Sequence, residues 1–170
     1  MESQAAKPKF SIMKGRDFPL SGPALVQLLR SVLSKGAFVR FRAKGFSMTP
    51  FIKNEDIITL SPLKTVSPNI GDVIAIVLRD ADKLCVHRVV GKRGDRFLTK
   101  GDNSSDTDGA VPKDSILGFV TRVERNGKEV SRGLGPERFL IAFLGGRGLL
   151  LPLILPMWKL LRIIVKRSPS

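Results

Sequence analysis

The sequence predicts a mainly β fold, a compact curled-sheet barrel or sandwich with one N-terminal helix before it and a hydrophobic C-terminal segment after it. Two patterns carry this prediction. Residues 21–36 place apolar side chains at the spacing of a helix, and residues 37 to about 130 form short segments rich in Val, Ile and Phe. Turn residues separate these segments, and short strands with such turns are typical of all-β barrels and sandwiches.

The N-terminal part divides into an arm and a helix. Residues 1–18 are polar, and we expect a flexible arm; because residues 1–14 hold no apolar run, we expect no secretory signal or membrane anchor there. Residues 19–36 are expected to be a packing helix, which Ser21 caps and Gly36 ends. Its predicted buried stripe consists of Leu25, Leu28, Leu29, Val32 and Leu33.

Residues 37–132 make up the predicted β domain. Its turn signals include SPN at residues 67–69, KRGD at 92–95 and NG at 126–127. The predicted strands are residues 37–44, 56–60, 73–78, 84–90, 96–100 and 116–124.

Residues 133–170 form a hydrophobic and basic tail. Its longest uncharged run extends only from residue 148 to 158, whereas a helix that spans a bilayer needs about 20 apolar residues. Pro152 and Pro156 also interrupt a helix in this run. We therefore expect residues 139–167 to lie on an anionic lipid surface as an interfacial segment. A true span and packing against the protein are the alternatives.

Charge and composition limit the partners. The chain has 29 Lys and Arg residues against 15 acidic ones, a net charge of +14 that suits nucleic acid or an anionic membrane. Nucleic acid is the less favoured partner, because aromatic stacking platforms are few and one helix followed by strands is no helix-turn-helix. The single cysteine, Cys85, excludes an internal disulfide and a zinc site made of cysteines.

Ser47, His87 and the acids of residues 101–108 are the candidates for chemistry. A serine hydroxyl needs a neighbouring base to act as a nucleophile at neutral pH, and an imidazole, with an unperturbed pKa of about 6.5, suits that role. A carboxylate behind the imidazole fixes its tautomer, and the order of the three residues along the chain varies between folds. Taken singly, each candidate also has an ordinary structural interpretation as part of a turn or a strand.

A calcium loop is the metal-binding alternative for the acidic run at residues 102–109. With Gly109 as the sixth residue of such a loop, Ser104 and Ser115 occupy its first and twelfth positions. A calcium loop needs Asp and Glu there. We therefore expect neither a metal nor another cofactor.

Four short motifs, taken together and in order, resemble those of the signal peptidase I family, serine peptidases that remove signal peptides. The motifs are GFSMTP at residues 45–50, GDVIA at 71–75, VHRVVG at 86–91 and GDN at 101–103. The resemblance covers about residues 40–122, and the same domain is shared with self-cleaving repressor peptidases. Most bacterial members have lysine where this chain has His87, and histidine is what archaeal and endoplasmic-reticulum members use.

The resemblance implies a role for each site residue and the curled-sheet fold of the signal peptidase type. Ser47 corresponds to the nucleophile and His87 to the base. Asp108 corresponds to the third catalytic acid, with Asp106 as its rival, and Asp102 shapes the site. The backbone N–H of Ser47 contributes to the oxyanion hole.

Two residues depart from the family pattern. Gly45 stands where many bacterial members have a serine that assists the oxyanion hole, and Phe46 stands where the family has glycine. We expect a weaker or different oxyanion hole and an altered substrate cleft. A third departure is that the lipid-seeking segment follows the domain, whereas the family usually anchors near its amino terminus.

The predicted function is a membrane-associated serine endopeptidase that cleaves signal or leader peptides. Its partners are a polypeptide substrate and an anionic membrane, and the side of the membrane stays open. One alternative is a self-cleaving repressor-type domain, although the usual helix-turn-helix and lysine base are missing. The other is a non-catalytic module of the same fold that binds membrane or nucleic acid, for which the net charge is the main support.

Overall fold

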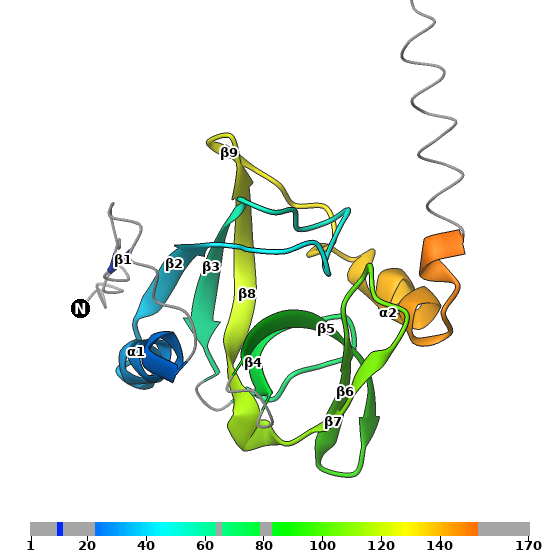
Figure 1. The fold of residues 1–170 in the computed structure, drawn as a ribbon, viewed down its shortest axis with the longest axis horizontal. Coiled ribbons are helices and arrows are strands. Elements are labelled where there is room, and N and C mark those ends of the chain that lie inside the picture. The colour runs from blue at the N-terminus through cyan, green and yellow to red at the C-terminus, as the bar shows by residue number, and fades with distance from the viewer. Residues whose placement is uncertain (1–9, 12–22, 64–65, 79–82, 153–170) are drawn as a thin grey trace, which may run out of the picture.

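The computed structural model of the chain describes residues 10–11, 23–63, 66–78 and 83–152. These residues form a mainly β body in which nine strands join one sheet, with α1 and α2 on opposite sides (Figure 1). In chain order the elements are β1 (Phe10–Ser11), α1 (Pro23–Ser34), β2 (Phe38–Arg42), β3 (Ile57–Pro62), β4 (Val73–Leu78), β5 (Lys83–Arg93), β6 (Arg96–Lys100), β7 (Thr107–Val111), the short 3-10 helix η1 (Lys113–Ser115), β8 (Ile116–Arg125), β9 (Lys128–Glu129) and α2 (Arg138–Gly146).

The prediction of a mainly β fold with an N-terminal helix is confirmed. All six predicted strands are present, and β4 and β6 have the predicted bounds. Three strands, β1, β7 and β9, are not among the predicted ones. β7 reads TDGAV, and Asp and Gly are depleted in strands, so the residues of β7 alone do not predict it. It forms because β6 offers a partner, with Phe97 opposite Val111.

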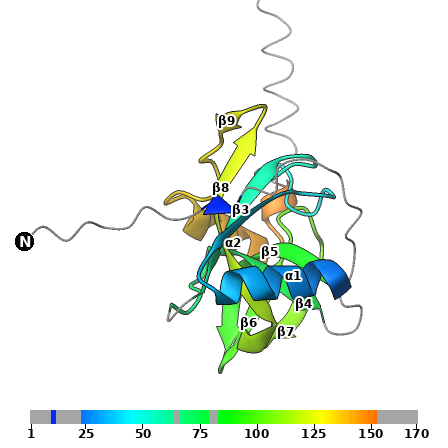
Figure 2. The same ribbon diagram turned by 90° about the vertical axis from the view of Figure 1, so that its left-hand side faces the viewer.

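α1 lies across the strands of the sheet (Figure 2). It packs through its buried residues Val26, Leu29 and Leu33. The sequence predicted Leu29 and Leu33 as buried but missed Val26, because the buried stripe runs along a slightly different line of the helix than expected. Three residues predicted to be buried are only half-buried, namely Leu25, Leu28 and Val32. The predicted cap, Ser21, lies outside the described residues.

The sheet order is β1-β2-β3-β8-β4-β5-β6-β7, and β9 pairs with β8. Neighbouring strands are antiparallel except for β1 and β2. The ladders shift register at several points, as between Thr59 and Leu60 in β3 and between Val89 and Gly91 in β5. Such bulges bend strands and increase the twist of a sheet. They bring the hairpins of β5, β6 and β7 around beside the loop that follows β2 (Figure 1).

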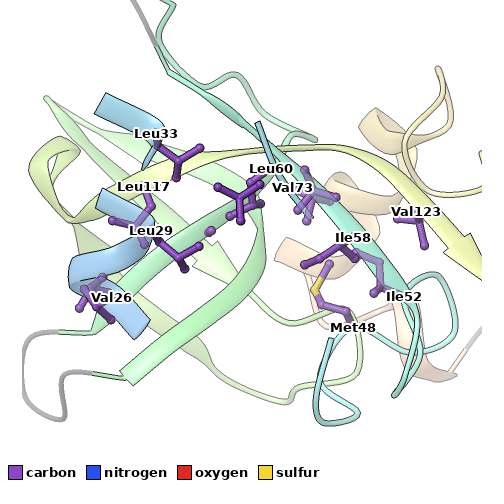
Figure 3. Packing of buried hydrophobic residues seen from close by; sticks show 14 residues of the cluster. Val26, Leu29, Leu33, Met48, Ile52, Ile58, Leu60, Val73, Leu117 and Val123 are labelled. Carbon is purple, nitrogen blue, oxygen red and sulfur yellow. The ribbon is translucent and has the colours of Figure 1, made fainter. Parts of the chain in front are cut away.

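β4 lies at the centre of the core because both of its faces are buried. Val73, Ala75 and Val77 belong to a hydrophobic cluster shared with α1, which Figure 3 shows between the helix and the sheet. Ile74 and Ile76 belong to a second cluster, shared with β5, β6, β7 and β8. A strand that is covered on both sides needs the unbroken apolar run that β4 has.

α2 attaches the first part of the predicted tail to the sheet. Its Ile141, Ala142 and Gly145 are buried, and the Lys100 Nζ at the end of β6 donates a hydrogen bond of 3.0 Å to the Gly145 carbonyl. Most of the predicted interfacial segment, residues 153–167, lies outside the described residues. No helix in the described part of the chain is long and apolar enough to cross a bilayer.

The packing of α1 gives a first prediction. Leu29→Ala removes a side chain that is fully buried between the helix and the sheet, so we expect the free energy of unfolding to fall by about 2–5 kcal/mol in urea denaturation. Gln27→Ala on the exposed face of the same helix is the matched control and should change it by less than about 0.5 kcal/mol. Equal stability of the two variants would contradict the packing described for α1.

Candidate active site

The loop between β2 and β3 presents Ser47 to solvent and anchors its neighbours in the core. Met48 and Ile52 are buried and pack beside Ile58 (Figure 3). The loop is closed by backbone hydrogen bonds, of which one joins the Ile52 N–H to the Met48 carbonyl at 3.0 Å. Ser47 itself is exposed. A fixed backbone with an outward hydroxyl is the arrangement that a nucleophile needs.

The structure brings Ser47, His87 and Asp108 together from three segments of the chain. The Oγ of Ser47 lies 3.1 Å from the Nε2 of His87, and the Nδ1 of His87 lies 2.6 Å from the Oδ2 of Asp108. His87 comes from β5 and Asp108 from β7. The two side chains are nearly buried, with 10% and 13% of their surfaces exposed.

These contacts define the proton positions of the three residues. An ionised carboxylate only accepts hydrogen bonds, so the Nδ1 of His87 donates to Asp108. In the neutral imidazole the Nε2 atom is then the unprotonated nitrogen, which accepts the hydrogen bond of the Ser47 hydroxyl. This is the tautomer in which the imidazole can take up the serine proton.

Asp108 has a further partner that the sequence analysis missed. The Thr99 hydroxyl, which is fully buried on β6, donates a hydrogen bond of 2.8 Å to the same Oδ2 atom that His87 contacts. No motif points to Thr99, because its role depends on the pairing of β6 with β7. The ladder places its side chain behind the carboxylate.

The three acids near the GDN motif have different surroundings. Asp108 contacts His87, whereas Asp106 is exposed and accepts a hydrogen bond of 2.6 Å from Ser105. Asp102 is buried and pairs with the Arg88 guanidinium. Of the three candidates for the third acid, Asp108 is therefore the one whose carboxylate lies within hydrogen-bond distance of His87.

Arg88 and Asp102 form a buried ion pair next to these residues. The guanidinium of Arg88 donates two hydrogen bonds to the carboxylate, at 2.8 and 2.7 Å, and two more to the carbonyls of Gly71 and Gly133, each at 2.8 Å. Burial raises the pKa of the Asp102 carboxyl, and the hydrogen bonds and positive charge of Arg88 oppose this. The pair ties the GDVIA, VHRVVG and GDN motifs to one another.

The GDN motif also holds the backbone of the nucleophile. The Asn103 N–H donates a hydrogen bond of 2.7 Å to the Ser47 carbonyl, and the Asn103 side-chain amide donates one of 3.3 Å to the Phe46 carbonyl. A Cβ atom on Gly101 would stand only 2.7 Å from that Ser47 carbonyl. Glycine at 101 therefore permits the close approach that brings the motif against the Ser47 loop.

The two departures from the family pattern have structural correlates. Gly45 has a φ of 100°, which side chains of L-residues rarely adopt, and its N–H donates to the Asn54 side chain at 2.9 Å. A serine at this position would be strained. Phe46 exposes 68% of its surface beside Ser47.

Cys85 lies two residues before His87 on β5, but its thiol is a poor candidate nucleophile. Burial raises the pKa of the Cys85 thiol above its ordinary value. At neutral pH the residue is therefore mainly the protonated thiol, whereas the reactive form is the thiolate. Its packing against the second hydrophobic cluster gives it a structural role.

The described residues form no metal site, and the cavity beside β3, β8 and β4 is separate from Ser47, His87 and Asp108. In the part of the chain that the structure describes, no group of three or more His, Cys, Asp or Glu side chains is placed to hold a metal ion. A cavity of about 480 Å³ lies between β3, β8 and the start of β4, with Phe38 and Arg138 in its lining. Ser47, His87 and Asp108 do not line it.

No protein-family model matches this chain, and neither does any curated protein. The functional interpretation therefore depends on the sequence motifs and on how the structure places their residues. The Ser47, His87 and Asp108 side chains form one continuous hydrogen-bonded chain with the polarity of a serine–histidine–aspartate triad.

The buried ion pair gives a second prediction. Arg88→Met leaves the Asp102 carboxylate buried without its partner, so we expect the free energy of unfolding to fall by about 3–5 kcal/mol. Lys44→Met is the matched control, because it breaks the exposed pair with Glu55 and should leave the urea midpoint almost unchanged. An Arg88→Met protein as stable as the Lys44→Met protein would show that the pair does not hold the site.

Proposed function

We propose that this protein is a serine endopeptidase of the signal peptidase type, with the curled-sheet fold of that family, and that it cleaves signal or leader peptides. The observation that carries the proposal is the hydrogen-bonded chain from Ser47 through His87 to Asp108. Four motifs that are separate in the sequence meet around it, held by Arg88 and Asn103. A non-catalytic binding module has no need for this arrangement.

Acylation begins at the Ser47 hydroxyl. Its Oγ attacks the carbonyl carbon of the scissile peptide bond while the Nε2 of His87 takes the hydroxyl proton. Asp108 stabilises the imidazolium that forms. The carbonyl oxygen becomes an oxyanion, for which the Ser47 backbone N–H is our proposed donor.

Acylation is completed when the leaving amine departs. The imidazolium of His87 gives its proton to the leaving amine, the carbon–nitrogen bond breaks, and an ester to Ser47 remains. In deacylation, water attacks the carbonyl carbon of this ester while the Nε2 of His87 takes a proton from the water. The Oγ of Ser47 then leaves and receives that proton back from His87. The products are two peptides, and no metal or cofactor takes part.

The proposal includes the partners of the enzyme. The substrate is a polypeptide with a signal or leader segment, and Phe46 shapes the cleft beside the nucleophile. Association with an anionic membrane through residues 139–167 suits such a substrate, which is itself lipid-seeking, and the charge of +14 supports this association. We assign no side of the membrane.

The catalytic assignment gives a third prediction. Ser47→Ala and His87→Ala each remove a member of the proposed triad, so kcat/KM for a signal-peptide substrate in detergent should fall by about 10³-fold or more. An acylating probe should label wild-type Ser47 and should leave the Ser47→Ala protein unmodified. Equal cleavage by wild type and both variants would refute the proposal.

The neighbouring acids provide the control for that experiment. Asp108→Asn removes the carboxylate that contacts His87 and should lower kcat strongly, whereas Asp106→Asn alters an exposed acid and should not. Similar activity of the two Asn variants would remove Asp108 from the mechanism.

Incubation of the protein without substrate tests the self-cleaving alternative, which predicts one internal cut.

A further inference from the structure

α2 has two apolar faces, of which only one is covered by the described part of the protein. Ile141, Ala142 and Gly145 are buried, and a Cβ atom at Gly145 would lie in contact with Val90 of β5. The opposite face carries three large apolar side chains with about half or more of their surfaces exposed: Phe139 at 52%, Leu140 at 60% and Phe143 at 51%. Apolar side chains grouped in this way mark interaction surfaces.

Two arginines flank this exposed face, and one of them is paired with an acid, since the Nη1 of Arg138 lies 3.3 Å from the Oδ1 of Asp72. The Arg138 guanidinium lies 5.0 Å from the centre of the Phe139 ring, and the Arg147 guanidinium lies 3.7 Å from the centre of the Phe143 ring. Arginine therefore flanks the apolar surface at both ends of the helix. Aromatic rings with cationic groups beside them are typical of surfaces that bind at the interface of a membrane.

The sequence after α2 continues the same character. Residues 148–158 are uncharged and mainly apolar, and the following stretch contains four basic residues and no acidic ones, namely Lys159, Arg162, Lys166 and Arg167. The chain as a whole carries a charge of +14. A second copy of the chain would bring the same positive charge to this face, so electrostatics disfavours it as the occupant.

We propose that the face of α2 formed by Phe139, Leu140 and Phe143 docks the protein on an anionic lipid surface. The apolar side chains enter the acyl boundary, and Arg147 lies at the level of the lipid phosphates while Arg138 keeps its contact with Asp72. This inference rests on the membrane association included in the proposed function and specifies its contact within the folded body, and it does not require peptidase activity.

The docking helix is connected to the candidate active site. Lys100 binds the Gly145 carbonyl of α2 and directly precedes the GDN motif, whose Asn103 holds the Ser47 carbonyl. A lipid surface bound to α2 is therefore connected, through these hydrogen bonds, to the loop that carries the nucleophile. Cleavage close to the membrane follows if the proposed function is correct.

Vesicle co-sedimentation of the full-length protein tests the docking proposal, and this is the fourth prediction. We expect binding to vesicles of phosphatidylglycerol and phosphatidylcholine, weak binding to phosphatidylcholine alone, and weaker binding at high salt. The variant Phe139→Ser/Phe143→Ser should reduce the partition coefficient by about tenfold or more. Val66→Ser/Ile70→Ser changes exposed apolar residues elsewhere and is the matched control, with binding like wild type.

Several outcomes would contradict the docking proposal, and two of them would identify another occupant of the face. Unchanged binding by Phe139→Ser/Phe143→Ser would overturn the proposal, as would equal binding to neutral vesicles. A dimer without lipid that this variant abolishes would assign the face to a second copy. Trp158 is the only tryptophan of the sequence, so its fluorescence reports on the tail. A red shift of this emission in Phe139→Ser/Phe143→Ser without lipid would show that the tail covers the face, and it would also overturn the proposal. Ser47→Ala should bind vesicles like wild type, which separates docking from proteolysis.

We also infer that Thr99 is a positioning residue for Asp108, an inference that depends on the proposed function. The hydroxyl of Thr99 and the Nδ1 of His87 both donate to the Oδ2 of Asp108, at 2.8 and 2.6 Å. Two donors on one oxygen fix the plane of the carboxylate. The orientation of the imidazole toward Ser47 follows from that plane.

Thr99→Val and Thr99→Ser test this role, and this is the fifth prediction. Thr99→Val keeps the shape but removes the donor, so kcat should fall by about tenfold or more, as for a hydrogen bond to a charged group, with KM nearly unchanged. Thr99→Ser keeps a hydroxyl donor, so its kcat should stay close to that of wild type. Thr121→Val, which alters a hydroxyl bound to the Thr59 carbonyl, is the matched control.

A spectroscopic measurement makes the test independent of activity. His87 is the only histidine in the chain, so the Nδ1 proton of its ring gives one assignable NMR signal. This signal should lie far downfield in wild type and in Thr99→Ser, and should shift or broaden in Thr99→Val. An unchanged signal together with unchanged kcat in Thr99→Val would refute the positioning role, whereas inactive wild type with the expected signals would refute only the proposed function.

Discussion

The buried ion pair between Arg88 and Asp102 is the interaction on which the arrangement of the candidate site depends. Both side chains are almost completely buried, and the guanidinium also binds the carbonyls of Gly71 and Gly133. Leaving either charge alone in the interior costs far more than the pair itself gains. The segments that carry these four groups therefore have to come together, whatever other conformations each of them can adopt.

The alternation of a β-strand connects this ion pair to the chemistry. Successive side chains of β5 point to opposite faces, so Arg88 enters the structural network while His87 faces Ser47 and Asp108. A shift of β5 by one residue would exchange the two faces and lose both sets of contacts. The buried arginine thus sets the register at which the imidazole reaches the serine.

The outer parts of the fold are defined by less specific interactions. α2 attaches to β5 through small buried residues and through Lys100, and it leaves Phe139, Leu140 and Phe143 uncovered. The sequence placed this helix within a lipid-seeking tail, because a run of apolar residues looks the same whether protein or lipid covers it. Among the residues that the structure describes, one face of the helix meets protein and the other face is exposed.

The sequence alone determined six of the nine described strands, the N-terminal helix and the order of the four motifs, because apolar periodicity and turn residues are local properties. It also singled out Ser47, His87 and three candidate acids. The motif resemblance favoured Asp108 as the third acid, with Asp106 as its rival. Only the tertiary structure placed Asp108 against His87, added Thr99 behind it and gave Arg88 its partners, since these contacts join residues that are distant along the chain. Strand pairing decides such contacts, and no local pattern records which residues a strand will face.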